Sequence, residues 1–491
     1  MKTATKRLIT CLIAVAPAGS IRAVSNDSPV TVAPSPTTTV AHTQINRVDV
    51  TDYGAKGDGS TDDTAAQQAA IAAAPSGGTV VWPRGKTGCF KTTATLNIIK
   101  PLTLHGHPGA CVLLATAHIN LFRVTSSNVT FTGLTMTGPQ YATYHRGENA
   151  VDVTGTFHPR RHPTNIRNFR ASNLKISGFG AAAIQLSYID GFTVSNSTIT
   201  NLPYAGIAAL SAIHGTISGN MVSNITGIGS PGRNAYGIFA ARLTDDLGNL
   251  RSQPNSANIT ISHNVIDGVP TWEGLDTHSG QNIALVRNIV NNTTYCISVG
   301  GSKNSTGTYA YGSSNATVSG NSCKSGVTDG SRQAGIVFTG APSSHSTGTL
   351  VGNSITGHGS STAMDGAIRV QYTTGVTVRG NSILYPSPIG IYGVGGNARL
   401  AITDNSIVDP WTNSTRIGQA QAIDIDGSNN STMIDGNDWK HVDKVATYLL
   451  STATGLGIRL VAGTANSATL GPNQNGATTY LSDAGGIVAA P

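Results

Sequence analysis

The segment TWEGLDTHSGQN (271–282) brings together residue types that suit acid–base chemistry. Asp276 and His278 lie two positions apart, so on a strand both side chains would face outward, about 7 Å from each other. Glu273 adds a second carboxyl group, and Trp272 offers an aromatic face against which a sugar ring can stack. These residues predict proton transfer on an exposed strand. The alternative is a plain solvated face, because outward positions on a β-structure are polar by default.

Neighbouring turns of a repeat, described below, bring further groups to this strand. We expect Phe239, Ala241 and Arg242 on the turn before it, and Ser298, Gly300 and Lys303 on the turn after it. The predicted catalytic set is Asp276, His278, Glu273, Arg242, Asp245 and Asp246, and the predicted substrate-binding set is Trp272, Tyr236, Tyr295 and Lys303.

Two mechanisms fit this set. Hydrolysis of a glycosidic bond needs two carboxyl groups, which Asp276 with Glu273, Asp245 or Asp246 would supply. Elimination or C5-epimerisation of a uronate needs a base, a proton donor and a cation that neutralises the substrate carboxylate. His278, Tyr236 or Tyr295, and Arg242 would fill those roles.

Further acidic residues and histidines lie outside this set, and most are expected to have structural roles. The strand QAIDIDG places Asp424 and Asp426 outward, as a distal subsite, a cation site or a plain polar face. We expect His358 in a turn, and His214 and His263 to be structural. No metal site is predicted, although Ca²⁺ remains an option, and no other cofactor is expected.

A repeat of short strands must position these residues. From about residue 128 an alternating apolar strand, a small residue and an Asn recur nine times, as in TISGNMV (216–222) and TVRGNSI (377–383). Alternation directs Val and Ile inward, and Gly and Asn allow sharp bends. The Asn side chains would stack and hydrogen-bond along one column, at positions 196, 220, 264, 288, 321, 353, 381, 405 and 437. The predicted fold is an all-β, right-handed parallel β-helix with an N-terminal capping helix.

Composition agrees with this fold and limits the partners. Charged residues make up only 11% of the 491 residues and Gly numbers 58, which suits short strands joined by many turns and excludes a disordered chain. The net charge of +7 is compatible with an acidic polymer. A nucleic-acid partner is not expected, because no basic stripe is interleaved with aromatic residues. No membrane partner is expected either, and the sequence leaves the oligomeric state open.

The first residues resemble an export signal. Lys2, Lys6 and Arg7 precede a short apolar stretch, Leu8–Ala16, which predicts a signal peptide over 1–23 and a protein secreted to the periplasm or outside the cell. Residues 24–46 are rich in Ser, Thr and Pro and are interpreted as a linker. Residues 47–491 would form one β-helix domain, with an N-terminal cap over 47–116 and a C-terminal cap over 446–491.

Four later cysteines fall into two pairs that match the repeat length. Cys89 and Cys111 are 22 residues apart, and Cys296 and Cys323 are 27 apart. Residues one turn apart stack at about 4.8 Å, so each pair is either a disulfide or a stack of reduced thiols.

The opening segment VDVTDYGAKGDGSTDDT (48–64) resembles the pectate-lyase-like β-helix superfamily, which includes polysaccharide lyases, hydrolases and tailspike-like proteins. The resemblance implies a β-helix with a carbohydrate partner, and a structural role for Asp52, Asp58, Asp62 and Asp63. The D-T-H of 276–278 is similar to the D-P-H strand motif of bacterial alginate epimerases. The N-T-D and R-I-K motifs of polygalacturonases are missing, which argues against that assignment.

The expected function is therefore a secreted enzyme that cleaves or remodels a polysaccharide containing uronate, by hydrolysis or β-elimination in a groove on the helix face. Two alternatives remain, a C5-epimerase acting on a uronan and a non-catalytic adhesin-like β-helix that binds polysaccharide.

Overall fold

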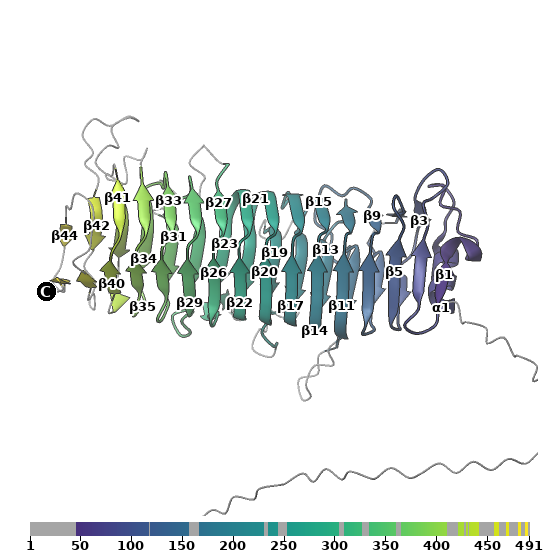
Figure 1. Cartoon of the computed structure of the whole chain (residues 1–491), viewed down its shortest axis with the longest axis horizontal. Helices are drawn as coiled ribbons and strands as arrows, with labels where there is room; N and C mark the ends of the chain where they lie inside the picture. The colour runs from purple at the N-terminus through teal and green to yellow at the C-terminus, as the bar shows by residue number, and fades with distance from the viewer. Residues whose placement is uncertain are drawn as a thin grey trace, which may run out of the picture. The chain divides into compact units, whose positions relative to one another are not determined.

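Parallel strands stack one above the other along a single axis in the computed structural model (Figure 1). The structure describes residues 46–116, 118–156, 166–229, 234–243, 253–303, 309–326, 333–359, 365–409, 421–426, 429–430, 432–440, 456–460, 468–470, 480–482 and 487–489. The predicted signal peptide and all of the predicted linker except its last residue lie outside the described residues. Among the described residues no helix is both long enough and apolar enough to cross a membrane.

The N-terminal end carries the one described α-helix, α1 (Thr64–Ala73), after β1 (Arg47–Asp49) and a 3₁₀ turn, η1 (Val50–Tyr53). Asp62 lies one residue before the N-cap of α1, and its carboxylate accepts the backbone N–H of Thr64, the first residue of the helix, at 3.1 Å. Asp63 occupies the N-cap position but makes no side-chain capping bond, and its carboxylate instead accepts the N–H groups of Lys56 and Gly57 in the preceding turn. That turn needs those bonds because its backbone groups have no strand partner.

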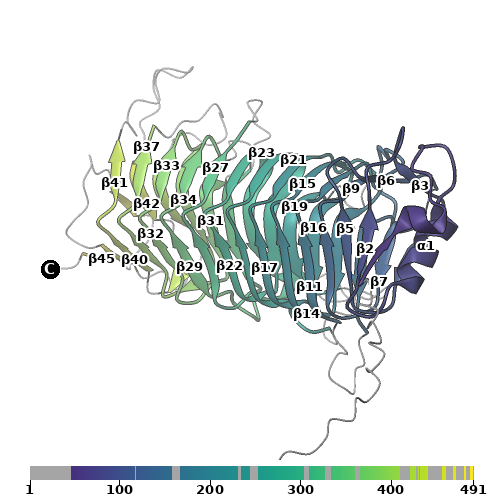
Figure 2. The ribbon, with the colours of Figure 1, turned by 45° about the vertical axis from the view of Figure 1, so that its right-hand side comes forward.

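Within the described residues, the coils contribute strands to two sheets, one of 16 strands and a larger one of 25. In both sheets the strands of neighbouring coils pair in parallel (Figure 2). The 16-stranded sheet consists of β1, β2 (Thr79–Trp82), β5 (Leu102–Gly106), β8 (Val129–Thr132), β11 (Ile166–Ser172), β14 (Ile189–Ser195), β17 (Ile213–Ser218), β20 (Ala257–Ser262), β22 (Gln281–Val286), β26 (Ala316–Ser319), β29 (Gly348–Val351), β32 (Thr377–Arg379), β36 (Ala401–Thr403), β40 (Thr432–Asp435), β43 (Ala468–Leu470) and β45 (Ile487–Ala489).

The 25-stranded sheet contains two ladders that share β21 (Val265–His278) and β23 (Ile289–Gly300). The first ladder also contains β3 (Phe90–Thr92), β6 (Cys111–Leu114), β9 (Thr135–Thr137), β12 (Lys175–Ser177), β15 (Thr198–Leu202), β18 (Met221–Ile225), β27 (Ser322–Lys324), β30 (Ser354–Thr356), β33 (Ser382–Leu384), β37 (Ser406–Val408) and β41 (Asp438–Lys440). The second contains β4 (Leu96–Ile98), β7 (Phe122–Val124), β10 (Val151–Thr154), β13 (Ala182–Ser187), β16 (Ala205–Leu210), β19 (Tyr236–Ala241), β28 (Ile336–Thr339), β31 (Gly366–Gln371), β34 (Ile389–Val394), β38 (Gln421–Asp426), β42 (Leu456–Leu460) and β44 (Tyr480–Ser482).

Two short pairs lie outside these ladders. Strands β24 (Ser302–Lys303) and β25 (Tyr309–Tyr311) are antiparallel, and β35 (Asn397–Ala398) pairs with β39 (Asn429–Asn430). Strands β42 to β45 lie within the segment predicted as the C-terminal cap, and they continue both large sheets.

The core runs along the axis, because each coil directs Val, Ile, Leu and Phe side chains inward onto those of its neighbours. In the 16-stranded sheet, Ile217, Ile261 and Leu285 pair in register from coil to coil, and all three are buried. A single coil could not bury these side chains alone, so stability comes from stacking. The predicted right-handed parallel β-helix is confirmed.

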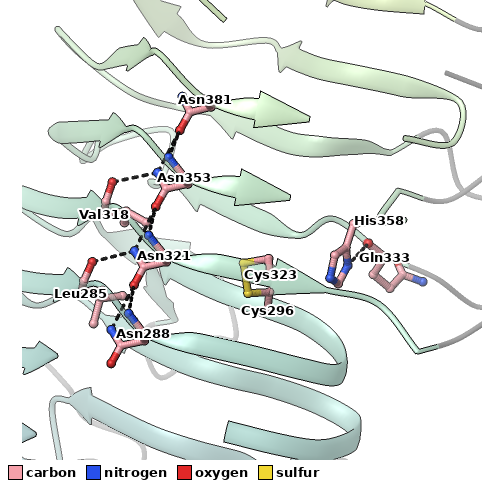
Figure 3. Close-up of a disulfide and its surroundings, with 10 residues drawn as sticks. All are labelled: Leu285, Asn288, Cys296, Val318, Asn321, Cys323, Gln333, Asn353, His358 and Asn381. Atoms are coloured by element: carbon pink, nitrogen blue, oxygen red, sulfur yellow. Dashed lines mark hydrogen bonds between the residues drawn. A yellow bond between two sulfur atoms is a disulfide. The ribbon is translucent and has the colours of Figure 1, made fainter. Parts of the chain in front are cut away.

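The predicted column of asparagines is confirmed for eight positions, from Asn220 to Asn437. Each carboxamide from Asn220 to Asn405 donates from Nδ2 to the next asparagine's Oδ1 at 2.9–3.0 Å. Figure 3 shows part of this column, in which Asn353 also donates to the backbone oxygen of Val318. The prediction was wrong for Asn196, which turns outward with φ +51° opposite Gly219. Ser197 occupies the column there, and its N–H donates to Asn220 Oδ1.

Both cysteine pairs are disulfides, which decides between the bridged and reduced alternatives. Cys89 is bonded to Cys111 and Cys296 to Cys323, each joining consecutive coils (Figure 3). Closing loops of this size stabilises the folded state by about 3 kcal/mol each in the chain-entropy model. The disulfides therefore reinforce the stacking along the axis.

Candidate active site

Strand β21 turns a corner just before the acidic residues. Its pairing with β23 shifts register between Val269 and Glu273, directly before Gly274. A Cβ on Gly274 would lie 2.4 Å from Val290 Cγ1 in the core, so this position faces inward without a side chain. The bend lets Glu273 and Asp276, three residues apart, share the outer face. Strict alternation would have placed them on opposite faces.

Three side chains converge on that face. Glu273, Asp276 and His278 each offer a ligand or proton-transfer atom, and these atoms all lie within 4.8 Å of one another. His278 Nε2 is 3.1 Å from Asp276 Oδ1. The Asp276 side chain is 1% exposed and that of His278 is 33% exposed, so the imidazole covers the carboxylate and meets solvent. Two carboxyl groups and an imidazole form a set of donors that suits either proton transfer or a divalent cation.

The predicted register around this strand is confirmed. Asp276 pairs with Phe239 on the preceding coil and with Ser298 on the following one. His278 likewise lies between Ala241 and Gly300. The small residues beside His278 leave space for its ring.

Of these two neighbours, Gly300 leaves no space for a larger side chain. A Cβ added there would lie 2.8 Å from His278 Cδ2 and 3.0 Å from Nε2. Gly300→Ala therefore pushes the imidazole from its position over Asp276, and we expect turnover to fall by about tenfold or more, because small misplacements of a reacting group are costly. The ring is one-third exposed and can move into solvent, so the melting temperature should change little. Turnover equal to that of the unsubstituted protein would show that the ring position does not matter.

An aromatic cluster flanks the acidic groups on the side of the earlier coils. Tyr236 and Phe239 are buried with ring centroids 4.6 Å apart, and Tyr204 contacts both rings. Burial raises the pKa of Tyr204 and of Tyr236, and Asp276 adds to both shifts. Tyr204 was missed by sequence reasoning, because it precedes β16 and lies outside the repeated strand pattern. Its hydroxyl group therefore lies close enough to Asp276 to interact with it electrostatically.

Burial also perturbs the second carboxyl group. Glu273 is 5% exposed, and its side chain lies beside those of Ser298 and Trp272. Burial, together with the nearby Asp276, raises the pKa of Glu273 to about 8, and His278 opposes this shift. Glu273 therefore holds its proton at neutral pH and can act as an acid.

This raised pKa predicts a pH-dependent stability. The folded state binds the Glu273 proton more tightly than the unfolded state does, so this contribution is complete below the ordinary pKa of 4.5 and is lost as the pH rises to about 8. Glu273→Gln should remove this loss, which is on the order of a few kcal/mol. Denaturant unfolding at pH 5 and pH 8 measures it, with the exposed Asp267→Asn as the control. An equal pH dependence in all three proteins would contradict the perturbed pKa.

The structure places the other predicted site residues as follows. Arg242 donates to Asn255 Oδ1, and its guanidinium lies over the ring of Tyr311, 4.8 Å from the centroid. Tyr295 pairs with Glu273 in register, and its ring lies 5.6 Å from that of Trp272. Asp245 and Asp246 lie outside the described residues, as does the side chain of Lys303.

The second acidic strand lies on the same face. Register pairings lead from Ser298 through Val337, Arg369 and Tyr392 to Asp424, whose side chain is buried. The side chain of Asp426 lies outside the described residues.

The predicted turn histidine follows β30. His358 is buried, and its Nδ1 lies 3.3 Å from the backbone oxygen of Gln333 (Figure 3).

Comparisons with known proteins identify the family. The family model "Rhamnogalacturonase A/epimerase, pectate lyase-like" matches residues 47–328, and "Right handed beta helix region" matches residues 301–461. An exo-poly-alpha-D-galacturonosidase of Dickeya chrysanthemi is 44% identical over 78 residues, which are 15% of this chain and 13% of that protein.

Solved structures agree on the fold. The catalytic unit of a GH87 alpha-1,3-glucanase from Streptomyces thermodiastaticus superposes with a TM-score of 0.57 at 14% identity, covering 92% of this chain and 71% of that one. Tailspike protein 3 of bacteriophage CBA120 gives a TM-score of 0.53 at 14% identity, covering 87% and 63%. Because its model covers more than half of the sequence, the chain belongs to the rhamnogalacturonase A/epimerase, pectate lyase-like family of β-helix proteins.

Proposed function

We propose that this protein is an enzyme that acts on a uronate-containing polysaccharide, and that His278 removes the proton at C5 of a uronate residue. The observation that carries the proposal is the arrangement of His278, one-third exposed, over the buried Asp276 at 3.1 Å. A substrate can reach the imidazole, whereas the carboxylate behind it is covered.

His278 and Asp276 have different roles in this mechanism. A neutral imidazole takes the C5 proton, and the buried carboxylate of Asp276 orients the ring and stabilises the imidazolium that forms. The electron pair left at C5 then either expels the oxygen at C4, giving a double bond between C4 and C5, or takes a new proton on the opposite face. The first outcome is elimination and the second is epimerisation. The expelled oxygen, or C5 itself, takes its new proton from water, because Glu273 holds a proton at neutral pH but is buried.

Three further features support a uronate substrate. The Dickeya relative is named for poly-galacturonate, although the match covers only a small part of either chain. The net charge of +7 favours an acidic polymer. Trp272 is partly buried and packs against the aromatic cluster, so an aromatic face lies beside the acidic groups.

Hydrolysis is the second candidate, and the raised pKa of Glu273 favours it. A protonated Glu273 close to Asp276 forms the acid and carboxylate pair that glycosidases use, and their close approach is nearer to the retaining than to the inverting arrangement. Both carboxyl groups are buried, however, so a glycosidic oxygen could reach them only if neighbouring side chains moved.

We further propose that the protein is secreted. The basic and apolar first residues resemble an export signal, and two disulfides persist more readily outside the reducing cytosol.

A screen over uronans, pectins and neutral glucans tests the function. Elimination gives an ultraviolet-absorbing unsaturated uronate, hydrolysis gives reducing ends without that absorbance, and epimerisation changes the uronate composition with no cleavage. Activity confined to neutral glucans would contradict the uronate proposal. Binding without any product would favour an adhesin-like β-helix.

A further inference from the structure

A second group of chemically active side chains lies several coils before the candidate active site. His118 follows β6, while His145 and Glu148 lie in the connection between β9 and β10. One nitrogen of each histidine and one carboxylate oxygen of Glu148 all lie within 4.8 Å of one another. From β10 to β21 the ladder makes four pairings, so this group lies about 19 Å from Asp276 along the axis. It is therefore a separate site.

The carboxylate of Glu148 is buried but not fully paired. Its side chain is 1% exposed, and Oε1 accepts the backbone N–H of His118 and lies 2.9 Å from His118 Nδ1. The other oxygen, Oε2, is buried and makes no hydrogen bond of ordinary geometry among the described residues, and the nearby hydroxyl group of Tyr141 is likewise buried without one. Leaving such an oxygen unpaired in a folded protein is costly unless a cation or donor satisfies it.

Gly180 leaves space for the side chains of His145 and Glu148, and hydrogen bonds hold the backbone around them in place. A Cβ on Gly180 would lie 2.2 Å from Glu148 Oε2 and 2.9 Å from His145 Cβ, so only glycine fits beneath them. The backbone N–H of His145 donates to the Gly180 oxygen at 2.7 Å, and the backbone oxygen of Glu148 accepts the N–H of Ala181 at 3.1 Å. His145 Nε2 contacts Thr143 Oγ1 at 3.1 Å, which can hold one tautomer and leave the other ring nitrogen as a ligand.

From this geometry we propose that His118, His145 and Glu148 bind a divalent transition-metal ion, with Zn²⁺ as the best match. Two imidazoles and one carboxylate form a zinc set with an open position, whereas calcium and magnesium prefer sets made of oxygen. The His118 side chain is 72% exposed, so it can close the remaining distance to the ion. Bound metal would fix the connection that carries Tyr144, whose ring lies 5.0 Å from that of Tyr204 in the aromatic cluster.

Zinc titration of the full chain tests this site. After treatment with a chelator, the protein should bind Zn²⁺ in calorimetry at neutral pH and its melting temperature should rise by about a few degrees. His118→Ala and His145→Ala should each weaken binding at least about tenfold.

Two control variants make the result specific. His214→Ala removes an exposed histidine paired with Asp190, and His278→Ala removes the imidazole of the other cluster. Both should keep the zinc affinity of the unsubstituted protein at this site. Absence of zinc binding, or binding lost in His278→Ala but kept in His118→Ala and His145→Ala, would overturn the proposal. Because His118 is exposed, its variant folds whether or not the buried Glu148 tolerates substitution.

Discussion

His278→Ala should lower turnover on the uronate polymer by about 10²–10⁴-fold, the range that a general acid or base contributes. The imidazole is the exposed member of the cluster and lies 3.1 Å from Asp276, so its removal leaves no group at that point to take a proton. Thermal unfolding should change little, because a side chain that is one-third exposed contributes little packing. Initial rates and melting curves of the same preparations measure both effects.

Two further variants make this prediction specific. Asp276→Asn keeps the size of the buried side chain and removes its charge, so it should also lower turnover strongly. His214→Ala, which removes an exposed histidine that is also paired with an aspartate, should leave turnover unchanged. Full activity in His278→Ala would exclude this imidazole from the chemistry.

Asn353→Ala should lower the free energy of unfolding by about 3–6 kcal/mol. Asn353 Oδ1 accepts from the N–H and the carboxamide of Asn321, and Asn353 Nδ2 donates to Val318 and Asn381 (Figure 3). The substitution leaves buried groups on both sides without partners, each costing about 1–3 kcal/mol. Chemical denaturation followed by circular dichroism measures the loss.

The control is an asparagine outside the column. Asn97 is exposed on β4, and its carboxamide donates only to the nearby backbone oxygen of Thr95 among its resolved hydrogen bonds. Asn97→Ala should change the unfolding free energy by less than about 0.5 kcal/mol. A similar small change in Asn353→Ala would mean that the column follows from the fold without stabilising it.

Much of the fold follows from the sequence because a repeat reveals its own register. The asparagine spacing identified the column, and it placed Phe239 and Ser298 beside Asp276 correctly. The prediction was wrong at Asn196, because Asn196 and Ser197 are successive polar residues and only the strand pairing assigns Ser197 to the column. A one-residue shift of this kind reverses the face on which a side chain lies.

The site was harder to predict than the fold. Glu273 shares a face with Asp276 only because β21 bends at Gly274, and a bend of this kind interrupts strand periodicity. The burial of Asp276 was also not predicted, since outward positions were expected to be solvated. Besides His278, the neighbours of Asp276 include Phe239 and Tyr204 from earlier coils, and no local pattern connects Tyr204 to Asp276.

The central claim is that the C5 proton of a uronate leaves during the reaction. A polyuronate substrate carrying deuterium at C5 measures this directly, by mass spectrometry of the products and of the label released to water. The mechanism predicts loss of the deuterium with every turnover, slowed by a primary isotope effect where proton removal limits the rate. Products formed with the deuterium still at C5 would contradict it and leave hydrolysis in its place.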